Sequence, residues 1–300
     1  MPPPTDVSFC MIVRNGSATL GDCLGSVAGL ADEFVVVDTG STDASPELAR
    51  AYGARVIRAR WREDFSAARN HYLKAARCGW VLSLDADEVL ERVDRDSFRE
   101  LLKAHPDTAF FFNIHNYFFA RGTSGAPLTC GDNCRATPGV GCSVTKTVRL
   151  FPKRRGVRYC FPVHESLVPA LVRREIRLTS SAFTVHHRGH LCTGDATANK
   201  AKLYRALGEK KVRQFPGYFL GYHELGKILL YEGHPLEAER MFTKCVRLNP
   251  VYPRAYYYLG LTLLAQSRRT EGVALLRRAA RLFPRRSDIA GLIATAGADA

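Results

Sequence analysis

The sequence predicts an α/β fold with a parallel, doubly wound sheet, followed by an all-helical segment that contains repeats. Short apolar runs rich in Val, Ile and Phe alternate with helical patterns over roughly the first ninety residues. Several of these runs end abruptly in Asp or Asn, as buried parallel strands do at the rim of a sheet. We therefore expect a first domain at residues 1–198 and a helical domain at residues 199–300.

The first domain opens with four strands separated by helices. The strands are expected at residues 7–13, 34–37, 55–57 and 80–84. Ser17 is expected to cap the first helix, which runs to about Leu30. Pro46 falls in the first turn of the second helix, and residues 65–76 form the third. Further strands are indicated at 110–112, 117–119, 146–151 and 183–187, with a loop over 121–143.

Composition and charge restrict the class of protein. The 300 residues are 46% hydrophobic and 24% charged, which is ordinary for a soluble globular protein. No apolar stretch approaches the ~20 residues of a membrane span, and residues 1–6 do not resemble a signal peptide, so we expect a cytoplasmic protein. The net charge of +14 lies in the back half, which suits an anionic partner such as a nucleotide diphosphate or an anionic membrane surface. A solvated basic face explains the last hundred residues equally well. Nucleic-acid binding would rest on net charge alone, so we set it aside.

Nine cysteines are many for a cytoplasmic protein. Cys10 and Cys23 lie in apolar or helical contexts and read as small core residues. Four others are more closely grouped, but their spacing matches no standard zinc pattern. These are Cys130, Cys134, Cys142 and Cys160, for which a structural metal or a disulfide remains an alternative.

The run from Val81 to Glu88 ends in three carboxylates. Asp85 and Asp87 are two residues apart, so an extended backbone would direct both side chains to one face. Hard oxygen ligands of this kind suit Mg²⁺ or Mn²⁺, which leave positions open for substrate phosphates. The alternative is a helix start at which Asp87 and Glu88 interact with the helix dipole.

Polar residues also end the neighbouring strands, and the carboxyl ends of parallel strands meet at one rim, where such sheets bind ligands. The residues expected at this rim are Asn15, Asp38, Asp43, Asp85 and Asp87. Their convergence favours a binding site over chance.

The helical segment repeats itself. Tyr222, Leu225, Gly226, Phe242 and Pro250 return 34 residues later as Tyr256, Leu259, Gly260, Leu276 and Pro284. This period and the Leu-Gly and Pro positions are the signature of tetratricopeptide repeats, which suggests a protein partner. Two repeats do not form an independent solenoid, so we expect them to stack on a preceding helix at residues 199–215.

Four motifs, in order and at these spacings, resemble those of family 2 glycosyltransferases. They are residues 8–15 (SFCMIVRN), 36–43 (VVDTGSTD), 64–70 (DFSAARN) and 84–88 (LDADE). With the repeats, the chain is similar to the bacterial branch that carries C-terminal tetratricopeptide repeats. The family usually has Glu after the first-strand Asn, whereas this chain has Gly16.

The resemblance implies a GT-A fold, a nucleotide-diphosphate sugar donor (a UDP-sugar or another), a divalent cation, Mg²⁺ or Mn²⁺, and inversion at the anomeric carbon. Carried onto this sequence, it implies that Asp38 contacts the base, that Asn15 and Asp43 belong to the donor site, and that Arg69 contacts the nucleotide. Asp85 would bind the ribose and Asp87 the metal.

The chemistry requires a base and charge stabilisation. An acceptor hydroxyl loses its proton as it attacks, and our candidate base is Glu165, whose alternative role is a salt bridge to an arginine. Negative charge on the leaving diphosphate calls for a metal and basic side chains. We expect His186 to complete the metal site. Supporting roles are expected for His164, Glu88, His187 and Arg149.

Two rival functions use the same observations. The first is a non-catalytic scaffold, in which a degenerate transferase domain presents the repeats to a protein partner. The intact acidic motif argues against it. The second is a nucleotidyltransferase, but residues 14–17 are too short for its Gly-rich phosphate loop. The acceptor stays open: a glycan such as a lipopolysaccharide core, a lipid-linked or peptide acceptor, or a small metabolite. Peripheral contact with an anionic membrane at its inner face is a further hypothesis.

Overall fold

The computed structural model describes residues 4–119, 140–187, 196–284 and 288–297. The chain divides into two compact units, Met1–Gly194 and Asp195–Ala300, whereas the sequence suggested a division after residue 198. Cys142 and Cys160 form no disulfide with another described residue, and Cys130 and Cys134 lie outside the described residues, as does the centre of the expected loop.

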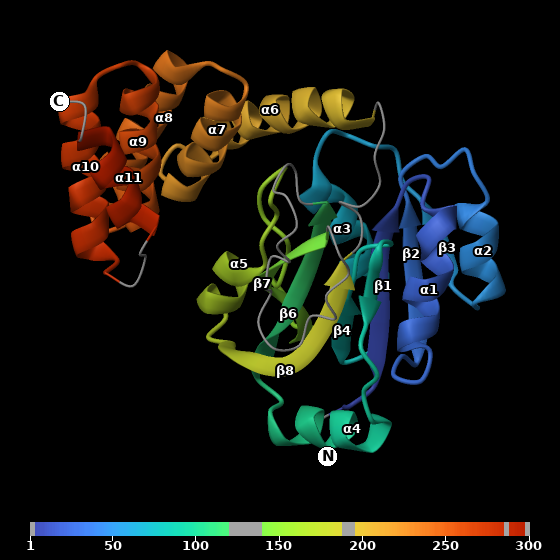
Figure 1. Ribbon diagram of the computed structural model, residues 1–300. Coiled ribbons are helices and arrows are strands. Elements are labelled where there is room, and N and C mark those ends of the chain that lie inside the picture. The colour runs from blue at the N-terminus through green and yellow to red at the C-terminus, as the bar shows by residue number, and fades with distance from the viewer. Residues whose placement is uncertain (1–3, 120–139, 188–195, 285–287, 298–300) are drawn as a thin grey trace. The chain divides into compact units, whose positions relative to one another are not determined.

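Four parallel strands form one half of the sheet in the first unit (Figure 1). They are β1 (Val7–Val13), β2 (Glu33–Asp38), β3 (Arg55–Arg58) and β4 (Trp80–Ser83), in the order β3-β2-β1-β4. The helices between them are α1 (Ser17–Val27), α2 (Ser45–Ala51) and α3 (Phe65–Ala75). This half is the predicted parallel, wound sheet, so the carboxyl ends of all four strands share one rim.

The other half makes the sheet mixed. It continues from β4 in the order β7 (Val140–Pro152), β6 (Thr108–Phe119), β8 (Arg177–His187) and β5 (Glu88–Leu90). β7 is antiparallel to β4 and β6, whereas β6 and β8 are parallel. The two short aromatic strands expected at 110–112 and 117–119 are therefore one strand. The residues between them, which include the polar Asn113, His115 and Asn116, continue the ladder with β7 because backbone pairing does not depend on side-chain polarity.

Each face of the sheet packs against its own helices. α1, α2 and α4 (Arg95–Ala104) pack on one face, with Leu24, Ala49 and Phe98 in its core. α3 and α5 (Val168–Arg173) pack on the other, through Tyr72 and Leu171. With both faces covered, the strands are held rigidly and their ends are fixed in space.

The N-termini of α1 and α3, near the rim, differ in their capping. Asp64 caps α3, since its Oδ1 accepts from the backbone N–H of Ala67 at 2.8 Å. The expectation that Ser17 caps α1 is wrong, because the N-cap residue is Gly16 and makes no side-chain bond. The backbone N–H of Ser17 instead donates to Asp43, in the loop after β2, at 3.0 Å. That bond ties two neighbouring loops together.

The second unit consists of helices, and the described ones pair as the repeat pattern predicts. They are α6 (Ala196–Gln214), α7 (Phe219–Tyr231), α8 (Pro235–Leu248), α9 (Pro253–Ala265), α10 (Arg269–Leu282) and α11 (Asp288–Gly297). A Cβ added at Gly260 would lie 2.9 Å from Leu276 and 3.0 Å from the carbonyl oxygen of Gly272. Small residues therefore allow α9 and α10 to approach closely, as Gly226 does for α7 against Phe242.

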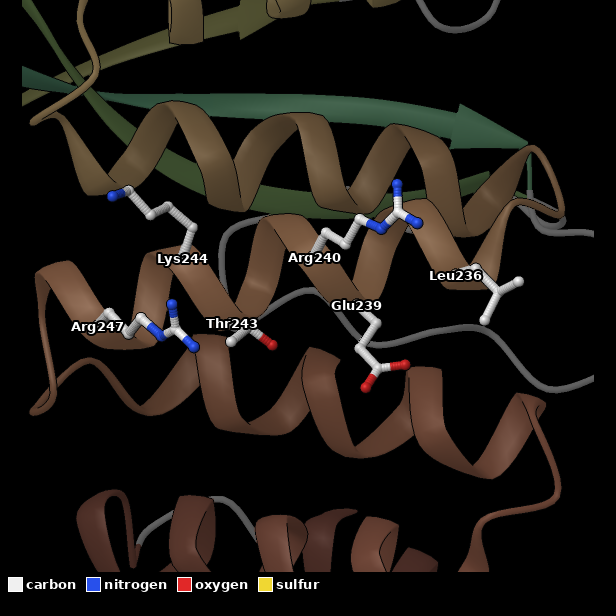
Figure 2. Close-up of a pocket in the computed structure, with 6 residues that line it drawn as sticks. All are labelled: Leu236, Glu239, Arg240, Thr243, Lys244 and Arg247. Carbon is white, nitrogen blue, oxygen red and sulfur yellow. The ribbon is translucent and has the colours of Figure 1, made fainter.

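One side of α8 carries a shallow groove of about 510 Å³ (Figure 2). It is lined by Leu236, Glu239, Arg240, Thr243, Lys244 and Arg247. Glu239 is engaged by Arg268 at 2.8 Å, whereas the exposed cations Arg240, Lys244 and Arg247 lie within 4.0 Å of no described carboxylate. In α10, the 34-residue repeat places Arg278 and Arg281 at the positions of Lys244 and Arg247, and Arg277 at that of Thr243. Among the helices of the described residues, none is both long and apolar enough to span a bilayer.

Candidate active site

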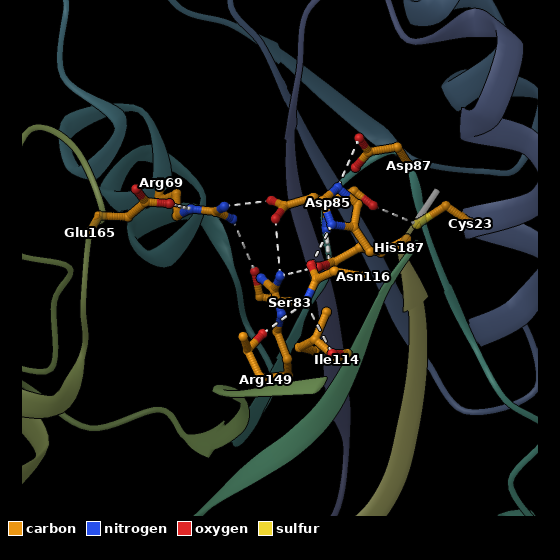
Figure 3. Close-up of polar contacts among 12 residues, drawn as sticks. Cys23, Arg69, Ser83, Asp85, Asp87, Ile114, Asn116, Arg149, Glu165 and His187 are labelled. Atoms are coloured by element: carbon orange, nitrogen blue, oxygen red, sulfur yellow. Dashed lines mark hydrogen bonds and ion pairs between the residues drawn. The ribbon is translucent and has the colours of Figure 1, made fainter. Parts of the chain in front are cut away.

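The acidic motif forms a turn beyond β4. The backbone N–H of Glu88 donates to the carbonyl oxygen of Asp85 at 3.0 Å, and the N–H of Asp85 donates to Glu88 Oε2 at 2.9 Å. β5 follows directly, so the alternative of a helix start is wrong. Because Asp85 and Asp87 lie in this turn rather than in an extended strand, their carboxylates have different partners (Figure 3).

Arg149 holds this turn from the neighbouring strand. Its Nη2 donates to Asp85 Oδ2 at 3.0 Å and to Glu88 Oε1. Leu150 pairs with Phe110 while Val148 pairs with Phe111, so Arg149 is the extra residue of a β-bulge in β7. A bulge redirects a side chain from its expected face, and here it directs a guanidinium to the strand ends.

Arg69, on α3, reaches the same carboxylate from the other side. Its Nη2 donates to Asp85 Oδ1 at 2.5 Å and its Nε donates to Glu165 Oε1 at 2.6 Å. The guanidinium is buried and lies 5.5 Å from the ring centroid of Tyr159. Glu165 thus makes the arginine salt bridge that was the alternative to its role as base, and the bond spans 96 positions in sequence.

Burial and the two arginines give the carboxylates different acidities. Burial alone would raise the pKa of Asp85, but Arg69 and Arg149 outweigh it and hold this pKa well below its usual range. Burial raises the pKa of Glu88 to about 7, with Asp85 adding to the effect and Arg149 opposing it. Asp85 is therefore a fixed anion at neutral pH, whereas Glu88 is much less acidic than an exposed carboxylate.

Asp87 lies beside a histidine that the sequence assigned only a supporting role. His187 Nε2 is 3.3 Å from Asp87 Oδ2, and His187 Nδ1 is 2.8 Å from Asn116 Oδ1 (Figure 3). His186, the expected metal ligand, instead lies with its Nδ1 2.8 Å from the hydroxyl of Tyr117. The geometry moves the candidate role from His186 to His187, because neighbouring residues of a strand face opposite sides of the sheet. The hydrogen bond to Asp87 raises the pKa of His187.

The remaining rim residues build two interlocked loops. Asn15, with a φ of 54°, accepts from the backbone N–H of Thr42 at 2.8 Å. Asp43 accepts from Ser45 and from the backbone of Ser17, and these bonds hold its pKa well below the usual range. Asp38 ends β2, is 4% exposed and accepts from the N–H of Ser41 at 2.9 Å.

Gly16 fits the close approach of its loop to the acidic turn. A Cβ at this position would lie 2.9 Å from Cγ2 of Val13 and 3.3 Å from Cβ of Ala86. A larger residue here would have to displace Val13 or the turn that holds Asp85 and Asp87. Gly16, which replaces the family's usual Glu, is therefore the residue that lets this loop pack tightly against the acidic turn.

Glu165 and His164 lie on a short closed loop. Backbone bonds between Cys160 and Ser166 close it, at 2.9 and 3.0 Å, and the carbonyl of Pro162 accepts from the N–H of Phe65 at the start of α3. Phe161 and His164 have φ values of 79° and 48°, which non-glycine residues adopt at a cost of about 1–3 kcal/mol. Such strain is concentrated at functional sites, and here it is stored next to the candidate base.

Sequence reasoning missed Asn116 and Ser83. The hydroxyl groups of Ser83 and Tyr72 form a hydrogen bond of 2.9 Å, in which either can be the donor. Arg69 Nη1 lies 3.5 Å from Ser83 Oγ. A polar residue inside an otherwise apolar strand was the available signal for both, since such residues need a partner once buried.

These features invite comparison with known proteins. A model described as glycosyl transferase family 2 matches residues 8–158, about half of the chain. The chain belongs to glycosyl transferase family 2. Family membership and the mixed sheet confirm the expected GT-A fold, and a tetratricopeptide-repeat model matches residues 221–252.

The names of two relatives correspond to the two parts of the chain. An uncharacterized glycosyltransferase of Rickettsia prowazekii is 31% identical over 261 residues, covering 85% of this chain and 79% of the relative. A TPR repeat-containing protein of Synechococcus elongatus is 29% identical and covers 88% of this chain, which spans only 62% of that relative's length. Among solved structures, one of S. aureus TarS, residues 1–349, is 14% identical to this chain and has a TM-score of 0.48. The match covers 93% of this chain and 91% of the TarS chain.

The donor set at the rim fits a divalent cation only in part. Within the described ranges, no group of three or more His, Cys, Asp or Glu side chains is arranged to hold a metal. Asp87 and His187 supply two candidate ligands, one oxygen and one nitrogen. Mg²⁺ and Mn²⁺ sites that use few protein ligands take the others from water and substrate phosphates, so the pair could supply the protein's share of such a site.

We predict that Arg149→Met lowers the free energy of unfolding by about 3 kcal/mol, because it leaves Glu88 and Asp85 without their buried cation. Urea unfolding of wild type and variant measures the difference. Arg154→Met is the matched control, since Arg154 pairs with Asp107 at the surface and should cost less than about 1 kcal/mol. Equal losses in the two variants would contradict a structural role for the Arg149 ion pairs.

Proposed function

We propose that the chain is a metal-dependent, inverting glycosyltransferase that takes a sugar from a nucleotide-diphosphate donor, a UDP-sugar in the first instance. Membership of family 2 supports the transferase class. The observation that carries the proposal is the division of the acidic motif: Asp85 is anchored by two arginines, while Asp87 faces His187 at the open end of the site. One carboxylate is thus available to order the donor and the other to bind a cation.

The nucleotide would lie across the ends of β1, β2 and β4. In this proposal the base contacts Asp38, and the loops locked by Asn15 and Asp43 form its wall. Asp85 accepts from the ribose, and its two arginines keep it ionised as an acceptor. Arg69 links this end to Glu165, so donor binding and the acceptor side share one side chain.

Asp87 and His187 would hold Mg²⁺ or Mn²⁺ beside the diphosphate, with the remaining ligands from the donor. The bound cation supplies neutralisation of the charge that develops on the leaving diphosphate. The protein's part is to keep the two ligands converging, and the turn between Asp85 and Glu88 does so through its pair of backbone and side-chain bonds.

Glu165 is the proposed base. Its carboxylate is 14% exposed and lies on the strained loop next to Arg69. Arg69 donates to one of its oxygens, and the second oxygen remains for the proton of an attacking hydroxyl. Inversion follows if that hydroxyl attacks from the face opposite the diphosphate.

The second unit offers surfaces for binding a partner. A glycan, lipid-linked or peptide acceptor is consistent with the site, and the basic α8–α10 face, defined as Arg240, Lys244, Arg247, Arg277, Arg278 and Arg281, favours an anionic surface. We propose peripheral contact of this face with anionic lipid at the inner side of the membrane, for a cytoplasmic enzyme. A protein partner bound through the tetratricopeptide repeat is the second candidate for this unit, and a non-catalytic scaffold is the alternative for the whole chain.

Thermal unfolding with a panel of nucleotide diphosphates tests the donor site. We expect one nucleotide with Mn²⁺ to raise the melting temperature of the wild type, because a ligand that binds only the native state stabilises it. Asp87→Ala should lose most of the metal-dependent part of this shift. The control is Asp96→Ala, which removes an exposed carboxylate on α4, outside the acidic motif. No shift with any nucleotide would favour the scaffold alternative.

Glu165→Gln tests the base. Gln keeps the shape and the oxygen that accepts from Arg69 but cannot take a proton, so release of nucleotide diphosphate from the donor selected by the panel should fall by roughly 10²–10⁴-fold. The melting shift with nucleotide should stay unchanged. If binding falls and the rate at saturation does not, Glu165 acts only by holding Arg69.

Vesicle co-sedimentation at low salt tests the membrane contact. Wild type should bind vesicles of phosphatidylglycerol and phosphatidylcholine and not vesicles of phosphatidylcholine alone. Reversing Arg240, Lys244 and Arg247 to Glu should weaken binding by roughly a hundredfold or more, at about 1 kcal/mol per cation. The matched control reverses Arg155, Arg158 and Arg173, exposed cations of the first unit. Equal losses in both triples would show that net charge, not the α8–α10 face, is responsible.

A further inference from the structure

The side chain of Asn116 makes contacts at both ends of its amide. Its Nδ2 lies 3.1 Å from the carbonyl oxygen of Ile114, 3.2 Å from that of Ser143 and 3.0 Å from Thr145 Oγ1. Its Oδ1 lies 2.8 Å from His187 Nδ1. The nitrogen and the oxygen of the amide are therefore both used, and Figure 3 shows Asn116 between Ile114 and His187.

These contacts determine which nitrogen of His187 carries hydrogen. A carbonyl oxygen only accepts, so the two carbonyls require the amino end of the Asn116 amide to face Ile114 and Ser143. Oδ1 then faces His187 and also only accepts, so His187 Nδ1 has to donate. In the neutral ring the lone pair consequently lies on Nε2, the nitrogen that faces Asp87 at 3.3 Å.

Sheet pairing holds the three groups in one row. β6, β8 and β5 are neighbours, with Asn116 paired to His187 and His187 paired to Glu88. Asp87 directly precedes β5, so the row from amide to imidazole to carboxylate crosses β6 and β8 and ends at the turn that leads into β5. Strand pairing therefore fixes Asn116 and His187, and the bonds between Asp85 and Glu88 fix the turn that holds Asp87.

We propose that Asn116 is a positioning residue that holds His187 in the Nδ1–H tautomer, so that Nε2 and Asp87 together bind the divalent cation of the donor site. A metal-bound imidazole commonly donates its other N–H to an oxygen acceptor, which fixes the ring and the tautomer. The inference rests on the metal-dependent function proposed above and adds the residue that orients its nitrogen ligand.

Three variants separate this role from support of the strands. Asn116→Leu removes the acceptor and the amino group together. Asn116→Asp keeps an oxygen for His187 but loses the donors to Ile114, Ser143 and Thr145. Thr145→Val removes one partner of the amino group and leaves the contact with His187 intact.

The measurement is the dissociation constant of Mn²⁺ in the presence of UDP, from the electron paramagnetic resonance of free Mn²⁺. We expect Asn116→Leu to weaken Mn²⁺ binding by roughly 10–100-fold, and Asn116→Asp and Thr145→Val to stay within a few-fold of wild type. Melting temperatures are recorded in parallel, because Asn116→Asp should lower the melting temperature while leaving the Mn²⁺ dissociation constant nearly unchanged. Equal weakening by Leu and Asp would assign Asn116 to strand support and overturn the proposal, as would a Leu variant that binds like wild type.

A second readout needs no metal. The ¹⁵N chemical shifts of the His187 ring, at a pH where the ring is neutral, report the tautomer directly. Wild type should be protonated at Nδ1, and Asn116→Leu should shift toward Nε2–H. If wild type shows the Nδ1–H form but binds no Mn²⁺ with UDP, the proposed function fails while the tautomer assignment stands. An Nε2–H wild type overturns the inference whatever the metal does.

Discussion

The buried contact of Arg149 with Glu88 and Asp85 is the interaction on which the donor end of the sheet depends. Arg149 is 7% exposed and Glu88 is 2% exposed, so neither is stabilised by water. Two carboxylates so close would repel one another without a cation between them. Because Glu88 also accepts the N–H of Asp85, the ion pair fixes the turn as well as the charges. That turn directs Asp87 away from the arginines and toward His187.

The contact exists because the second half of the sheet is irregular where the first is regular. The parallel strands deliver Asp38 and Asp85 to one rim by simple alternation with helices. Arg149 reaches that rim only through the bulge in β7, which adds one residue opposite Phe110 and Phe111. The regular half of the sheet thus places the carboxylates. The irregular half supplies Arg149, which pairs with them, and His187.

The sequence predicted the regular half well because its signals are local. An apolar run that ends in Asp identifies a buried strand and its end without knowledge of the partner strand. The choice between His186 and His187 was different. Their contacts depend on how β8 pairs with β6, where the register shifts by two residues between the pairs Phe111–Ser180 and Asn113–Thr184, and no local pattern shows that shift. Glu165 pairs with Arg69, 96 positions away, and no local pattern identifies that partner, although the sequence allows a salt bridge to an arginine as one role of Glu165.

The charge distribution of the site also bears on why a cation would be needed. A diphosphate brings negative charge to a rim already rich in carboxylates, and arginines often neutralise phosphates directly. Here Arg69 is bonded to Asp85 and Glu165, and Arg149 to Asp85 and Glu88, so both guanidinium groups are already compensated. Neutralisation of the leaving group then calls for a further positive charge, and Asp87 with His187 is where the described residues favour one. In the proposed function the arginines arrange the acidic motif, and a cation bound by Asp87 and His187 would supply the positive charge that the leaving group needs.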